Sequence, residues 1–197
     1  MSLTRATIII LLILVIDQVS KIYIKTHFTL GEDVEVFSWF KIYFIENEGM
    51  AWGAKIPGKY GKLALTLFRI GAIIGIGYWL WDTVRKKQPA VLIGSIALIF
   101  AGAFGNIIDS VFYGVLFGDS AGQVAGFLPE GGGYGTWFHG KVVDMFSFSF
   151  FNPVFNVADS SISVGVALLL LFHKKAFPKK KEEKVVETET EEKNTSI

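Results

Sequence analysis

The chain has 197 residues, of which 51% are hydrophobic, and a formal net charge of +1 at pH 7. This length is typical of one domain, and the apolar content exceeds that of ordinary soluble domains, which indicates a membrane protein. The absence of cysteine excludes disulfides, thiolate catalysis and cysteine metal sites. The histidines His27, His139 and His173 lie far apart in the sequence, so we expect no zinc centre.

Four apolar stretches approach the roughly 20 residues that a helix needs to cross a bilayer. They cover residues 6–24, 62–82, 90–109 and 153–172. The first contains Asp17 and Lys21 and lacks the small-residue cleavage site of a signal peptide, so we interpret it as a retained span. We therefore predict a membrane α-helical fold with four transmembrane helices.

The second stretch carries two features of its own. Gly71 and Gly75 form a G-x-x-x-G pattern, which favours close approach of a neighbouring helix. Arg69 is expected to extend toward the outer headgroups or to contact a lipid phosphate.

The basic residues predict the orientation of the chain, because they concentrate on the cytoplasmic side of membrane proteins. Arg5, residues 85–87 and the lysines from Lys174 onward lie on short segments. We expect both termini in the cytoplasm of a multi-pass protein.

Residues 1–177 are predicted to form one integral-membrane domain. Residues 178–197 are charged and of low complexity, and predict a disordered cytoplasmic tail.

The two outer segments, residues 25–61 and 110–152, are more than linkers. Residues 34–49, "VEVFSWFKIYFIENEG", are aromatic and β-branched and predict one or two strands, and residues 141–150, "KVVDMFSFSF", alternate in polarity as a strand does. A small extracytoplasmic sheet is therefore expected. The Gly-rich residues 114–140 lack the ending of a phosphate-binding loop, so we expect flexibility there rather than nucleotide binding.

Ionisable and amide side chains gather near the outer ends of the apolar stretches: Asp17, Lys21, Asn106, Asp109 and Asp159. Asp159 is expected about six residues into its helix, roughly 9 Å below the outer boundary. Asp144 lies on the predicted strand that leads into this helix. Asp17 and Lys21 are four residues apart, and they could simply neutralise each other.

The remaining polar residues also have structural interpretations. Asn106 could donate an interhelical hydrogen bond, and Asp109 could face water at a helix end. Asn156 could cap the helix that follows it. Asp159 has no basic neighbour in the sequence, and a carboxylate in hydrocarbon is costly, which favours a functional role.

Asp144 and Asp159 suggest a specific chemistry if the fold brings them together. Two carboxylates in a partly dry site share one proton, and such a pair can activate water while protonating a carbonyl oxygen, as in aspartic proteases. Their separation in the sequence does not show that they meet. A small proton-coupled transporter and a non-enzymatic membrane assembly protein remain alternatives.

Five motif blocks together resemble a known family. They are "DQVSK" (17–21), "NEGMAWG" (47–53), "GAFGNIID" (102–109), "VVDMF" (142–146) and "FNVAD" (155–159). In this order they resemble the blocks of lipoprotein signal peptidase, also called signal peptidase II. The resemblance extends from the first apolar stretch to the fourth, and covers nearly all of the chain except the tail.

The resemblance implies a bacterial inner-membrane aspartyl endopeptidase with its site near the periplasmic face. Its partners would be membrane lipid and a prolipoprotein whose cysteine carries diacylglycerol, with cleavage just before that cysteine. No cofactor, metal ion or nucleic acid is implied. The catalytic dyad would be Asp144 and Asp159. Supporting or substrate-binding positions would be Asn47, Asn106, Asp109, Asn156, Asp17 and Lys21.

Two features depart from the family pattern. Ser110 stands where the family commonly has Arg, so a cationic contact in that region is absent or comes from elsewhere. The Gly-rich residues 114–140 form a longer insertion than in the simplest members, and the sequence does not predict its role.

Overall fold

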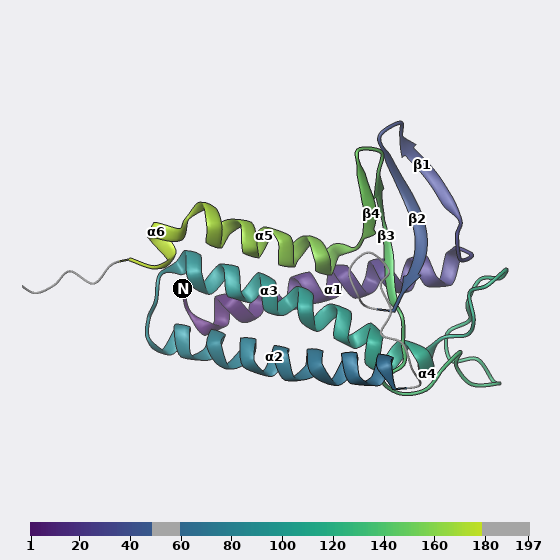
Figure 1. Ribbon diagram of the computed structural model, residues 1–197, viewed down its shortest axis with the longest axis horizontal. Helices are drawn as coiled ribbons and strands as arrows, with labels where there is room; N and C mark the ends of the chain where they lie inside the picture. Colours follow the sequence, from purple (N-terminus) through teal and green to yellow (C-terminus); the bar gives the residue numbers. More distant parts are fainter. Residues whose placement is uncertain (49–59, 179–197) are drawn as a thin grey trace, which may run out of the picture.

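The computed structural model describes residues 1–48 and 60–178. In these residues an antiparallel four-stranded sheet stands at one end of a bundle of helices (Figure 1). The main helices are α1 (Leu3–His27), α2 (Gly61–Arg85), α3 (Ala90–Ile108) and α5 (Val157–Leu171). The sheet has the order β1 (Asp33–Phe37), β2 (Phe40–Asn47), β3 (Val142–Phe148), β4 (Phe151–Phe155).

Helix α3 is the centre of the bundle and packs against α1, α2 and α5. Its approach to α5 is close because glycines face it: a Cβ on Gly102 would lie 2.2 Å from the Ala158 carbonyl oxygen. A Cβ on Gly165 of α5 would lie 2.8 Å from the Ser95 carbonyl oxygen. The expected close approach at Gly71 and Gly75 is wrong within the described residues, because none of their atoms would lie within 4 Å of a Cβ at either position.

Three helices of the described residues are long and apolar enough to cross a membrane: Leu3–His27, Gly61–Arg85 and Ala90–Leu116. Their outer faces expose large apolar side chains, such as Leu12 on α1 and Phe68 on α2, as expected for helices surrounded by lipid. The third span joins α3 to a π-helix, η2 (Asp109–Tyr113), and a short helix, α4 (Gly114–Leu116). These elements confirm a membrane α-helical fold with a small sheet.

The predicted fourth span, residues 153–172, requires a correction. Its first residues belong to strand β4, which pairs with β3 through Phe155 and Phe146, so the helix α5 begins only at Val157 and has 15 residues. Asp159 therefore lies in the first turn of α5 and not about six residues inside a helix. After α5 the chain turns into the short helix α6 (His173–Ala176).

The sheet confirms the strands that alternation predicted and places Asp144 on β3 opposite Ile45 on β2. On the side of β3 away from Asp144, Val143 and Met145 join a core with Phe44 of β2 and Ile24 of α1. This core fixes the sheet to the C-terminal end of α1.

The Gly-rich segment 114–140 makes specific contacts that its composition did not predict. Phe117 and Tyr134 pack into the same core as the sheet, and residues 117 and 124 form bridges with residues 127 and 29. The buried Lys25 pairs with Glu46 and donates to Ser120 at 2.9 Å. The expected flexibility is therefore replaced by a segment that folds back onto the sheet end.

Two predicted features lie outside the described residues. They are most of the second motif block, residues 49–53, and the charged tail from residue 179. Within the described residues, the start of α1 and the helix α6 both lie at the end of the bundle away from the sheet (Figure 1).

Candidate active site

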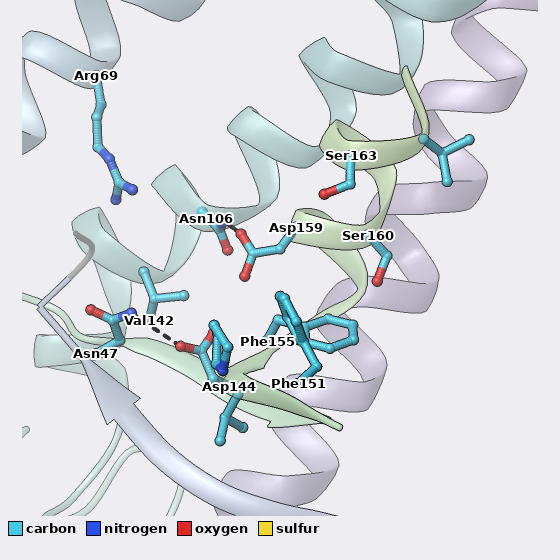
Figure 2. Close-up of a pocket in the computed structure, with 13 residues that line it drawn as sticks. Asn47, Arg69, Asn106, Val142, Asp144, Phe151, Phe155, Asp159, Ser160 and Ser163 are labelled. Carbon is cyan, nitrogen blue, oxygen red and sulfur yellow. Dashed lines mark hydrogen bonds between the residues drawn. The ribbon is translucent and has the colours of Figure 1, made fainter. Parts of the chain in front are cut away.

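A cavity of about 530 Å³ opens where α5 meets the sheet (Figure 2). Its charged and amide lining residues are Asn47, Arg69, Asn106, Asp144 and Asp159. Aromatic rings of Phe151 and Phe155 from β4 form part of the wall. The cavity thus combines two carboxylates, a guanidinium and amides with an apolar wall.

The first turn of α5 positions Asp159. Asn156 caps this helix, and its Oδ1 atom accepts the backbone N–H of Asp159 at 2.9 Å. A carboxylate in the first turn is favoured by the helix dipole, and the cap fixes the direction in which the side chain leaves the helix. Asn156 therefore has the capping role expected of it.

Two asparagines connect Asp159 to Asp144. Asn106 donates to Asp159 Oδ1 at 2.8 Å and accepts from Asn156 Nδ2 at 3.1 Å. Asn156 Nδ2 also donates to Asp144 Oδ1 at 2.7 Å. Asn47 of β2 donates to the other Asp144 oxygen at 3.2 Å (Figure 2). Both carboxylates are therefore held by amide donors in one network.

Burial makes Asp144 a weak acid. Only 1% of the residue is exposed. Burial raises the pKa of Asp144 to about 7, and the neighbouring Asp159 charge adds to this rise, while the donors Asn47 and Asn156 oppose it. Asp144 therefore keeps its proton to a higher pH than an exposed aspartate does.

A buried cluster of charged residues contacts this network through Asn106. Lys21 pairs with Asp17 and Asp109, each at 2.9 Å, and donates to Asn106 Oδ1 at 2.8 Å, so its three N–H groups all have acceptors. Asp17 accepts the backbone N–H of Ala158 on α5 at 2.9 Å. We call Asp17, Lys21 and Asp109 the charge cluster.

The structure brings all eight sequence-predicted residues together: Asp144, Asp159, Asn47, Asn106, Asp109, Asn156, Asp17 and Lys21. Asp17 and Lys21 do neutralise each other, as one interpretation expected, but Asp109 joins them. The water-facing alternative for Asp109 is wrong, because this residue is fully buried and accepts the backbone N–H of Val143 at 3.3 Å.

Sequence reasoning missed two polar residues. Gln18 bridges Asp17 and Asp109 with its amide nitrogen, at 3.0 Å to each; its place inside the "DQVSK" block was the available signal. For Arg69 the sequence predicts a position at the outer headgroups or a contact with a lipid phosphate, and it does not predict that this residue lines the cavity with the two carboxylates. The buried Ser110 hydroxyl donates to the Asn106 backbone carbonyl at 3.0 Å. Lys21 of α1 pairs with the neighbouring Asp109 and Arg69 of α2 lines the cavity, so the cations of this region come from other elements.

Comparison with known proteins gives a consistent result. The family model described as Signal peptidase (SPase) II matches residues 9–174. The chain is 48% identical over 183 residues to a lipoprotein signal peptidase of Porphyromonas gingivalis, with 83% of this chain and 80% of that protein covered. It is 31% identical over 180 residues to the lipoprotein signal peptidase of Staphylococcus aureus, with 90% and 93% covered.

Solved structures agree with the sequence relatives. A bacterial membrane enzyme determined by the in meso method at 2.3 Å superposes with a TM-score of 0.67 at 28% identity, over 92% of this chain and 94% of that one. A second such structure, at 1.9 Å, gives a TM-score of 0.65 at 27% identity, over 89% and 96% of the two chains.

Proposed function

Because the chain belongs to the signal peptidase II family, we propose that Asp144 and Asp159 are the water-activating dyad of an aspartic-type endopeptidase. Membership makes the protein a multi-pass membrane peptidase that removes signal peptides from prolipoproteins. This replaces the transporter and assembly alternatives. The observation that carries the dyad is that both carboxylates line one cavity and are joined through Asn156 and Asn106.

The chemistry follows from the different surroundings of the two carboxyl groups. Asp144, with its pKa near 7, holds the proton and donates it to the scissile carbonyl oxygen. Asp159 takes a proton from water, whose oxygen attacks the carbonyl carbon. When the tetrahedral intermediate collapses, Asp144 takes back a proton from one of its two hydroxyl groups, the C–N bond breaks, and Asp159 gives its proton to the leaving amine. The products are a signal peptide with a new carboxylate and a lipoprotein with a free cysteine amino group.

The substrate that fits this position is a precursor whose cysteine already carries diacylglycerol, cut just before that cysteine. The acyl chains hold the cysteine at the membrane surface. The dyad lies at the sheet end of the bundle, away from the start of α1 and from α6 (Figure 1). We place the sheet end at the periplasmic face and both termini in the cytoplasm, in agreement with the distribution of basic residues.

The test uses one synthetic precursor peptide with and without the diacylglyceryl group, and identifies the products by mass spectrometry. We expect the unmodified protein to cut only before the cysteine, and to cut the unlipidated peptide at least about a hundredfold more slowly, because the lipid supplies remote binding energy. Asp159→Asn should cut neither peptide while keeping the unfolding temperature of the parent. Near-normal cleavage by Asp159→Asn, or no cleavage by the parent, would contradict the proposal.

A further inference from the structure

Arg69 is a cation that faces the dyad without pairing to it. Figure 2 shows its side chain leaving α2 toward the cavity that Asn106 and Asp159 line. In residues 1–48 and 60–178, its Nη1 atom is buried and has no hydrogen-bond partner. Asp159 and Asp144 act on it electrostatically. A buried donor without an acceptor costs free energy, so Arg69 of the free protein is poised to bind a hydrogen-bond acceptor from a ligand.

That group has to be an acceptor, because a guanidinium has only donors. An anion such as a phosphate would lie beside Asp159 and Asp144, and the repulsion between like charges would oppose its binding. A neutral carbonyl oxygen avoids this repulsion and still receives a charge-assisted hydrogen bond. The hydroxyl-bearing Ser163 of α5, which lines the same cavity, suits a polar chain with carbonyl groups.

We propose that Arg69 binds a carbonyl oxygen of the lipidated precursor beside the scissile bond and thereby holds the substrate against the dyad. This inference rests on the proposed function. The precursor offers two sources of such an oxygen. One is the backbone of the residues before the cut, whose carbonyls are unpaired in an extended peptide. The other is the pair of ester groups of the diacylglyceryl moiety.

The test measures KM and kcat with two precursors that share one peptide and differ in the lipid. One carries diacylglycerol, and the other carries dialkylglycerol, whose ether links have no carbonyl. Arg69→Met should raise KM for the diacyl precursor about ten- to a hundredfold, the loss expected for one hydrogen bond to a charged group. The kcat should change far less, because the dyad is intact. Arg69→Lys should recover part of the loss.

Arg85→Met is the matched control, since it removes the same charge from the other end of α2, where Arg85 lies over the Trp81 ring at 5.3 Å. Arg85→Met should leave KM unchanged.

If Arg69→Met raises KM equally for both precursors, the oxygen belongs to the peptide. If the dialkyl precursor already has the raised KM and the variant adds nothing, the oxygen belongs to an ester. Either result supports the site.

Three results would overturn it. The first is a KM within about twofold of the parent for Arg69→Met on the diacyl precursor, against the tenfold change expected. The second is a fall in kcat at constant KM, which would mean that Arg69 acts on the dyad and not on the bound substrate. The third is inhibition of the parent, but not of Arg69→Met, by phosphate-bearing lipid, which would assign the site to an anion. If the parent cleaves the precursor in the same assay, these results leave the dyad proposal untouched.

Discussion

At the scale of single residues, Asp144 shows how burial favours the protonated form of a carboxyl group. The side chain leaves a strand at a point where β2, β3 and α5 converge, so that solvent is excluded and another carboxylate is close. Its oxygens still have donors in Asn47 and Asn156, which keep the group oriented in either protonation state. The two carboxyl groups of the site are therefore chemically different, although both are aspartates.

The pH dependence of cleavage follows from this difference. Because the pKa of Asp144 is raised to about 7, its neutral form predominates below pH 7 and is lost as the pH rises through that value. We expect kcat/KM for the lipidated precursor to fall about tenfold per pH unit on the alkaline side, with a midpoint near 7. Circular dichroism over the same range checks that the fold persists. A rate that stays constant up to pH 9 would show that no proton on Asp144 is needed.

At the scale of elements, the packing of α5 against α3 sets the position of Asp159. The Cβ of Ala158 would lie 3.3 Å from a Cβ on Gly105, and the Ala158 carbonyl faces Gly102 even more closely. The helices touch backbone to backbone in the turn that carries Asp159, so a change in their separation moves the dyad.

Gly102→Ala tests this coupling. The new methyl group would lie 2.2 Å from the Ala158 carbonyl oxygen, so the helices have to separate, at a cost of about 1–3 kcal/mol or more. We expect a lower unfolding temperature in detergent and a clear loss of kcat. Gly71→Ala is the control, since no atom of residues 1–48 and 60–178 would lie within 4 Å of the new methyl group, and it should preserve both quantities. Equal behaviour of the two variants would show that the contact does not position Asp159.

The sequence predicts these elements unevenly, for physical reasons. The aromatic and β-branched composition predicts β2, and alternating polarity predicts β3, because each strand has one face in the core. The sequence does not predict strand β4, because Pro153 and Val154 are apolar enough to belong to a membrane-spanning helix. Only the pairing of β4 with β3 shows that these residues form a strand. The G-x-x-x-G spacing at Gly71 and Gly75 does not indicate which face of the helix is covered, and in the part of the chain that the structure describes no other element packs against these two glycines.

At the scale of the whole molecule, the charge cluster joins the helices to the sheet. Lys21 and Asp17 come from α1 and Asp109 comes from η2. Asp17 accepts the backbone N–H of Ala158 on α5, and Asp109 accepts the backbone N–H of Val143 on β3. The motif blocks predicted which residues matter, and the i, i+4 spacing predicted the pair of Lys21 with Asp17. The contacts with Asp109, Asn106 and the backbone of other elements depend on tertiary structure, which no local pattern contains.

Lys21→Met should therefore destabilise the whole fold, because it leaves Asp17 and Asp109 buried without a counter-ion. Removing one partner of a buried ion pair costs about 3–5 kcal/mol. Lys86→Met is a matched control: Lys86 also pairs with an aspartate four residues earlier, at 2.7 Å, but its side chain is 62% exposed. An exposed pair contributes about 0–1 kcal/mol. Similar unfolding temperatures for the two variants in detergent would contradict a stabilising role for the charge cluster.

The dyad itself is tested most directly by kcat/KM for the lipidated precursor with Asp144→Asn, Asp159→Asn and the double variant. If two groups act as one unit, removal of either one abolishes the effect of both. Each single variant should therefore lower kcat/KM at least about a thousandfold, and the double variant should lower it no further than either single variant does. If a single variant keeps a rate within about tenfold of the parent, or if the double loss equals the product of the single losses, the two aspartates do not work as a dyad.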